Sequence, residues 1–189
     1  MSVRLFVALA LRDDLRQRLG ELISRLKPAG RGARWARPEA MHITLKFIGH
    51  VEPEKRAEVR AALEPIRSPQ AVEMRFRGVG FFPDERRPRV VWCGIEATQN
   101  LSVLASQIDR ALEVLGIARE SRDFVPHLTL ARFRAPEKAP ELVRLANDLG
   151  SGELGSARET EFYLFESVLH PSGAEYRKLD TFPFVEEAS

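Results

Sequence analysis

Two short segments of the chain share a pattern in which histidine and threonine alternate with apolar residues. His42 and Thr44 lie in MHITLKFIG, residues 41 to 49, and His127 and Thr129 lie in PHLTLARF, residues 126 to 133. Successive side chains of a strand point to opposite faces, so each segment places an imidazole beside a hydroxyl on one face. If the two segments face each other, one site holds two imidazoles and two hydroxyls.

Two imidazoles are suited to acid–base chemistry at phosphorus. An imidazole has an ordinary pKa of about 6.5, so it can give or take a proton near neutral pH. One imidazole can activate a water while the other protonates the departing oxygen, and threonine hydroxyls can hydrogen-bond phosphate oxygens. Neither histidine lies in an HExxH pattern or beside a carboxylate, so we expect no metal and no cofactor. The pattern therefore predicts hydrolysis of a phosphodiester.

The segments around the two patterns are related by a constant offset of 85 residues. The offset carries His42 to His127 and Thr44 to Thr129, and it aligns RLFVALA, from residue 4, with RVVWCGI, from residue 89. One histidine at a strand start is more typical of a structural residue, whereas two at matched positions favour function. His50 and His170 lack the pattern and are expected at the surface. Two copies exclude a solenoid and favour two like halves with a cleft between them.

Hydrophobic periodicity predicts the elements that carry these segments. Strands are predicted over residues 4–11, 41–49, 71–77, 89–95, 126–133, 159–168 and near 176–184, and helices over 13–27, 54–66, 101–115 and 140–149. Residues 28–38 contain proline and glycine and are predicted to form a loop. At 189 residues we expect one domain or two tightly packed lobes.

Composition limits the class of protein. The content of 44% hydrophobic and 30% charged residues is typical of a globular protein. Cys93 has no partner, which excludes a disulfide framework and a cysteine zinc site. The apolar run from Leu5 to Leu11 is too short for a membrane span and is followed at once by charged residues, which is a poor signal peptide. We therefore expect a cytoplasmic protein.

The small net charge predicts that any surface that binds nucleic acid is local. The formal net charge is +2, although 24 of the 29 basic residues are arginines, whose planar fork suits phosphate. A GC-rich genome or solvated helix faces would give the same bias.

At this point the quoted segments resemble a known family. HITLKFIG and PHLTLARF are similar to the paired HxTx motifs of the two-histidine (2H) phosphoesterase superfamily. RLFVAL, RVVWCG and LFESVLHPSGAEY narrow the resemblance to the RNA 2′,3′-cyclic phosphodiesterases, formerly called 2′-5′ RNA ligases. The resemblance implies an α+β fold of two pseudo-symmetric lobes, each a small, mostly antiparallel sheet with helices outside, around a cleft that carries both motifs. Residues 1–189 would form a single bilobal domain.

The same resemblance implies a reaction and roles. The terminal 2′,3′-cyclic phosphate of RNA would be opened to a 2′-phosphate without metal, and 2′-5′ ligation would be the reverse reaction. Independently of the resemblance, we expect a monomer. His42 would be the proton donor and His127 the proton acceptor, while Thr44, Thr129 and Arg132 would bind the phosphate. The partners would be RNA 3′ ends or nucleotides that bear the cyclic phosphate.

Strand alternation conflicts with one of these roles. Counting by twos from His127 places Arg132 on the opposite face of an ideal strand, so it reaches the site only if the strand ends or bulges. Lys46 has the right parity in the first motif and is a competing cation. Phe47 is the residue at the position that matches Arg132.

Other interpretations remain open at this point. A related 2H esterase acting on 2′-5′ oligonucleotides or small cyclic phosphates has the same motifs, and so does a non-catalytic protein that binds phosphate or RNA ends. Aromatic residues that either stack on a base or pack in the core and loops are Trp35, Trp92, Phe81 and Phe82. Arginines that either follow an RNA backbone or form a solvated face lie at positions 75, 77, 86, 87 and 89.

Overall fold

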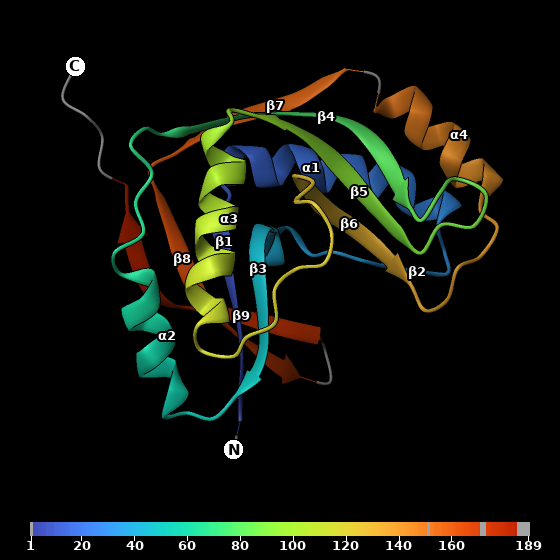
Figure 1. The fold of residues 1–189 in the computed structure, drawn as a ribbon. Coiled ribbons are helices and arrows are strands. Elements are labelled where there is room, and N and C mark those ends of the chain that lie inside the picture. The colour runs from blue at the N-terminus through green and yellow to red at the C-terminus, as the bar shows by residue number, and fades with distance from the viewer. Residues whose placement is uncertain (1, 151, 171–172, 185–189) are drawn as a thin grey trace.

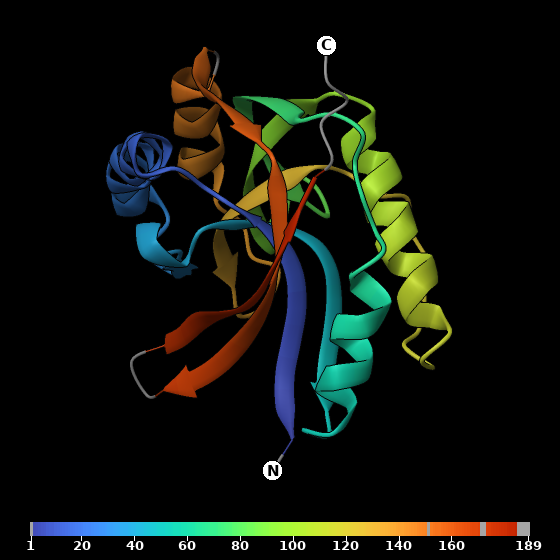
Figure 2. The same ribbon diagram turned by 90° about the vertical axis from the view of Figure 1, so that its left-hand side faces the viewer.

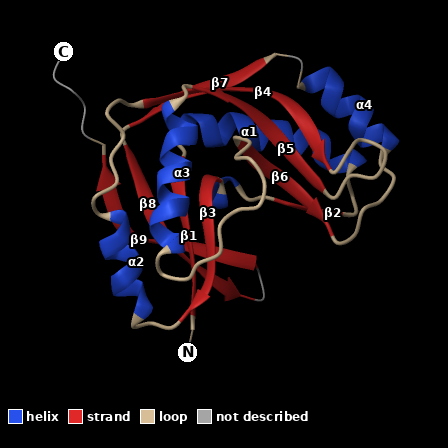
Figure 3. Cartoon of the chain, viewed as in Figure 1, coloured by secondary structure: helices blue, strands red, loops and turns tan. Residues whose placement is uncertain are grey.

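The computed structural model describes residues 2–150, 152–170 and 173–184, which form two antiparallel sheets and four α-helices (Figure 1, Figure 3). The first sheet has the order β3-β1-β8-β9, with strands at His42–Val51, Val3–Ala10, Glu161–His170 and Gly173–Pro183. The second has the order β2-β6-β5-β4-β7, with strands at Ala33–Trp35, His127–Phe133, Val90–Ala97, Val72–Phe82 and Glu153–Glu159. Each motif therefore begins a strand, β3 in one sheet and β6 in the other.

The helices cover the two sheets in pairs. They are α1 (Asp13–Leu26), α2 (Lys55–Leu63), α3 (Asn100–Glu113) and α4 (Pro140–Leu149). Helix α1 lies beside α4, and α2 lies beside α3, on opposite sides of the molecule (Figure 2). The apolar stripe predicted for the first helix is buried, and its members are Leu15, Leu19, Leu22, Ile23 and Leu26. No helix in the described part of the chain is long and apolar enough to cross a membrane.

Helices α1 and α3 each pack on the sheet of the other lobe. Helix α1 follows β1 of the first sheet but packs against β7 of the second, and α3 follows β5 of the second sheet but packs against β3 of the first. Each sheet is thus covered by one helix that follows its own strands and one that follows strands of the other sheet. The predicted α+β fold of two lobes is confirmed.

Several predicted boundaries were wrong. Residues 28–38 are not a simple loop, because they contain β2 and overlap the short 3-10 helices Lys27–Ala29 and Pro38–Ala40. The helix predicted to reach residue 66 ends at Leu63, since Pro65 cannot continue it. The strand predicted over 71–77 extends to Phe82, and β7 was missed, because its sequence ELGSARE has no run of apolar side chains.

Candidate active site

The two motif histidines are held in the same way. The Nδ1 atom of His42 lies 2.9 Å from the carbonyl oxygen of Ala40, and Nδ1 of His127 lies 2.8 Å from that of Val125. A carbonyl oxygen can only accept a hydrogen bond, so Nδ1 carries the proton in both rings. The Nε2 atom of each imidazole is therefore the atom that can exchange a proton with a bound molecule.

Aromatic side chains surround His42. The ring of Phe6 lies 4.6 Å from the imidazole and the ring of Tyr176 meets it edge-on at 4.8 Å, measured between centroids. Phe6 also stacks on Phe165 of β8 at 5.1 Å. These residues belong to a small buried cluster that is separate from the main core, so the first sheet presents an apolar floor beneath the imidazole.

His127 has an aromatic setting of its own. Phe82 meets the imidazole edge-on at 5.3 Å, and Trp92 lies 6.4 Å away. Phe82 and Trp92 stack on each other at 5.1 Å. Gly80 leaves room for this indole, because a Cβ at that position would overlap the ring. Phe82 and Trp92 thus border the second histidine, whereas Phe81 is buried in the main core.

A β-bulge resolves the position of Arg132. In the ladder between β5 and β6, Trp92 pairs with Thr129 but Val91 pairs with Ala131, so Leu130 is an extra residue. Because of this extra residue, each later residue of the strand lies on the opposite face from the one that strict alternation predicts. Arg132 consequently lies on the face of Thr129, and its Nη2 donates a hydrogen bond of 3.4 Å to the Thr129 hydroxyl.

The equivalent bulge in the first motif moves Lys46 away from the histidines. Ala8 pairs with Thr44 but Val7 pairs with Lys46, so Leu45 is the extra residue. The prediction that Lys46 has the right parity to reach the site was therefore wrong. Phe47 takes the place on the histidine face and is 51% exposed.

Lys46 is instead an internal residue. Its side chain is 1% exposed, and its Nζ lies 2.6 Å from Oδ1 of Asp109 on α3. The same Nζ donates to the carbonyl oxygen of Ala118 at 2.6 Å. Lys46 therefore ties β3 to α3 and to the loop that leads toward the second motif.

The positive charge of Arg132 acts on residues of both motifs. Burial lowers the pKa of His42 below its ordinary value of 6.5, and the positive charge of Arg132 lowers it further, against a raising effect of the hydrogen bond to Ala40. The two motif strands lie close by, because β3 of the first sheet and β6 of the second contact each other. Arg132 thus touches Thr129 of one motif and acts on the histidine of the other.

Sequence reasoning missed Phe6 and Tyr176 as neighbours of His42. Tyr176 lies on β9, far along the chain, and only its place in the segment LFESVLHPSGAEY drew attention to that region. Phe6 shares a face with Ala8, the ladder partner of Thr44, which becomes visible only once the register is known.

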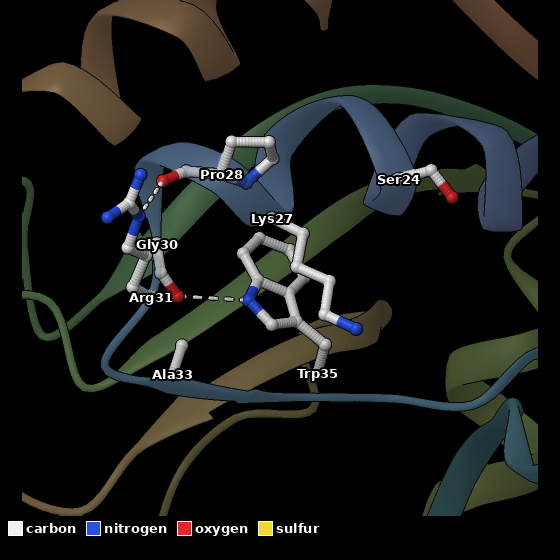
Figure 4. Close-up of a pocket in the computed structure, with 7 residues that line it drawn as sticks. All are labelled: Ser24, Lys27, Pro28, Gly30, Arg31, Ala33 and Trp35. Atoms are coloured by element: carbon white, nitrogen blue, oxygen red, sulfur yellow. Dashed lines mark hydrogen bonds between the residues drawn. The ribbon is translucent and has the colours of Figure 1, made fainter.

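A separate hollow lies away from the histidines. It has a volume of about 380 Å³ and is lined by Ser24, Lys27, Pro28, Gly30, Arg31, Ala33 and Trp35 (Figure 4). Trp35 of β2 donates from its indole nitrogen to the carbonyl oxygen of Gly30 at 3.0 Å, so this indole packs against the segment before β2 and does not join the two imidazoles.

The remaining candidates from the sequence do not form one site. Arg77 pairs with Glu96 at 3.4 Å, and Arg87 donates to the carbonyl oxygen of Pro136 at 3.2 Å, so these two arginines have different partners on different elements. Cys93 is buried, and burial raises the pKa of its thiol to about 12. Within the described ranges, no group of three or more His, Cys, Asp or Glu side chains is placed to hold a metal ion.

Comparison with known proteins identifies the family. The family model described as LigT like Phosphoesterase matches residues 9–92 and again 95–176, so each match contains one motif. The RNA 2′,3′-cyclic phosphodiesterase of Methanothermobacter thermautotrophicus is 35% identical over 183 residues, covering 96% of this chain and 99% of the relative. That of Archaeoglobus fulgidus is 34% identical over 180 residues, covering 95% and 99%.

A solved structure extends the likeness to the fold. The crystal structure of the protein TT0787 of Thermus thermophilus superimposes with a TM-score of 0.81 at 29% identity, covering 98% of this chain and 100% of that one. The family model, the curated relatives and the fold agree over nearly the whole chain, and the chain belongs to the LigT-like phosphoesterase family.

Proposed function

We propose that this protein hydrolyses the terminal 2′,3′-cyclic phosphate of RNA to a 2′-phosphate without a metal ion. The observation that carries the proposal is the matched hydrogen bond at each motif, which leaves Nε2 of His42 and of His127 available for proton transfer. Curated relatives with the name RNA 2′,3′-cyclic phosphodiesterase, at up to 35% identity, support the choice of substrate.

The parts of the site account for each step of the reaction. Nε2 of His127 accepts a proton from water as its oxygen bonds to phosphorus, and the bond from phosphorus to the 3′ oxygen breaks. Nε2 of His42 donates a proton to that 3′ oxygen, which leaves a 3′-hydroxyl and a 2′-phosphate. The hydroxyls of Thr44 and Thr129 donate to non-bridging oxygens, and Arg132 neutralises the negative charge.

The pKa of His42 imposes a condition on this mechanism. Burial and Arg132 favour the neutral ring in the free protein, yet a proton donor must be protonated. The anionic substrate opposes that effect, since a nearby negative charge raises the pKa of an imidazole. We therefore expect kcat/KM to fall as the pH rises through a value below 6.5, the ordinary pKa of His42.

Matched histidine variants test the proposal. We expect His42→Ala and His127→Ala each to lower kcat by about 10²- to 10⁴-fold, the contribution of one positioned acid or base. His50→Ala and His170→Ala are the controls, because these histidines lie outside the motifs. The assay follows an oligonucleotide that ends in a 2′,3′-cyclic phosphate, with and without a chelator. Loss of turnover in chelator, or a motif variant as active as the controls, would contradict the mechanism.

The product distinguishes the remaining interpretations. A 3′-phosphate product would show that the 2′ oxygen, and not the 3′ oxygen, is the leaving group. Binding without turnover would favour a non-catalytic protein that recognises RNA ends. Hydrolysis of 2′-5′ oligonucleotides alone would favour a related 2H esterase. Because every step is reversible, 2′-5′ ligation is expected when an RNA 5′-hydroxyl replaces water.

We further propose that residues 1–189 act as one bilobal domain, as a monomer in the cytoplasm. The exchange of α1 and α3 between the sheets supports a single folding unit. Light scattering after size-exclusion chromatography tests the monomer, and a dimer mass would contradict it.

A further inference from the structure

An arginine lies directly opposite Arg132 in the second sheet. Strand β2 is the edge strand next to β6 (Figure 1), and its Arg34 pairs with Arg132 in the ladder. Residues directly opposite in an antiparallel pair have their side chains on the same face. Arg34 therefore shares the face of Arg132 and Thr129, one strand farther from His127.

This arrangement places like charges side by side. Opposed like charges destabilise a sheet unless an anion compensates them. Among the described residues, no carboxylate lies within 4.0 Å of the guanidinium of Arg34, Arg89 or Arg132. Burial lowers the pKa of Arg132, and the charge of Arg89 lowers it further against the opposing effect of Tyr176, so Arg89 adds to the same positive field.

The other end of this face holds arginines that face a carboxylate. Arg77 of β4 and His127 of β6 are both ladder partners of Gly94, so Arg77 lies on the histidine face two strands away. Its guanidinium pairs with Glu96 at 3.4 Å. Glu96 is also the ladder partner of Arg75, whereas Arg34 and Arg132 are ladder partners of each other. A polyanion that leaves the histidines is therefore drawn toward β6 and β2.

We propose that Arg34 binds the phosphodiester group that precedes the reacting nucleotide, so that the enzyme prefers RNA oligonucleotides to cyclic mononucleotides. The inference rests on the proposed function, in which Arg132 and Thr129 hold the terminal phosphate. Neighbouring strands are about 4.8 Å apart, so a second guanidinium beside Arg132 reaches beyond that terminal phosphate. An arginine fork binds phosphate oxygens in pairs, and each phosphate contact adds a salt-dependent contribution to affinity.

The test compares two substrates that share their reacting end. These are adenosine 2′,3′-cyclic phosphate and an oligoadenylate pentanucleotide that ends in the same cyclic phosphate. We expect Arg34→Gln to lower the ratio of kcat/KM for the pentanucleotide to kcat/KM for the mononucleotide by about tenfold, the effect of one charged contact. The slope of log(kcat/KM) against log salt for the pentanucleotide is expected to become shallower by about 0.7.

Arg144→Gln is the matched control, because it removes the same charge from an exposed position on α4. We expect it to leave the ratio unchanged. An equal loss for both substrates in Arg34→Gln, or no change in the ratio, would overturn the inference while leaving the proposed function intact. If the wild type hydrolyses neither substrate, the proposed function fails. Fluorescence anisotropy with the 2′-phosphate pentanucleotide then decides the inference, since Arg34→Gln must still weaken binding about tenfold relative to Arg144→Gln.

Discussion

Replacement of Lys46 by methionine is expected to leave a buried carboxylate without its main partner. The ammonium group of Lys46 contacts Asp109, whose side chain is only 13% exposed. Removal of one partner from a buried ion pair costs about 3–5 kcal/mol. Asp109 keeps hydrogen bonds from the Glu120 amide and from Arg119, both at 3.2 Å, so we expect the lower end, about 3 kcal/mol.

Thermal and urea unfolding measure this effect. In a chain of this size a loss of about 3 kcal/mol lowers Tm by about 6–12 °C. The control is the double variant Lys46→Met, Asp109→Leu, which removes both charges and is expected to recover much of the loss. A loss below about 1 kcal/mol for Lys46→Met would refute the reasoning, and so would a double variant whose loss equals the sum of the two single ones.

The pH dependence of stability gives a second measurement of the same pair. Burial opposes the charge of Asp109, but hydrogen bonds from Lys46, from the Glu120 amide and from Arg119 outweigh it and hold its pKa below the ordinary value of 3.8. A lowered carboxyl pKa contributes stability that is present above that ordinary value and is lost as the pH falls through the lower, folded value. We expect the decline below pH 4 to be shallower in Lys46→Met than in the wild type.

Two further predictions concern other titrating groups. Arg132→Gln removes a positive charge that lowers the pKa of His42, so the pKa of this imidazole is expected to rise, as followed by NMR titration; an unchanged value would show that the charge of Arg132 does not reach the ring. Burial raises the pKa of Glu159 to about 7, so its contribution to stability is present below 4.5 and is lost as the pH rises through 7. Glu159→Gln is expected to raise Tm at pH 8 but not at pH 4, and an equal shift at both would contradict this.

The sequence allowed most strands and helices to be predicted, because apolar side chains alternate or recur where elements are buried. It did not allow the bulges at Leu45 and Leu130 to be predicted, since the extra residue is recognisable only against the partner strand. A prediction from strand alternation alone therefore placed Lys46 on the histidine face and Arg132 on the opposite face, which is the reverse of the structure. The roles of both histidines, both threonines and Arg132 in catalysis remain predictions.

Contacts between residues of distant strands could not be predicted from the sequence either. Tyr176 and Phe6 border His42 because β9, β8 and β1 are neighbours in one sheet, and no local pattern records that order. The edge strand β2 is only three residues long, too short for a periodic signal, yet it carries Arg34.

The positions of helices α1 and α3 correspond to those of exchanged elements in a domain-swapped dimer. A half-length chain with one motif, folded alone, would leave the apolar stripe of its first helix without a sheet to cover. Two such chains would bury both stripes by exchanging these helices about a twofold axis, and each would contribute one histidine to a shared centre. In the present chain the two halves are covalently joined, so matched positions can differ, and Phe47 occupies the position in the first motif that Arg132 occupies in the second.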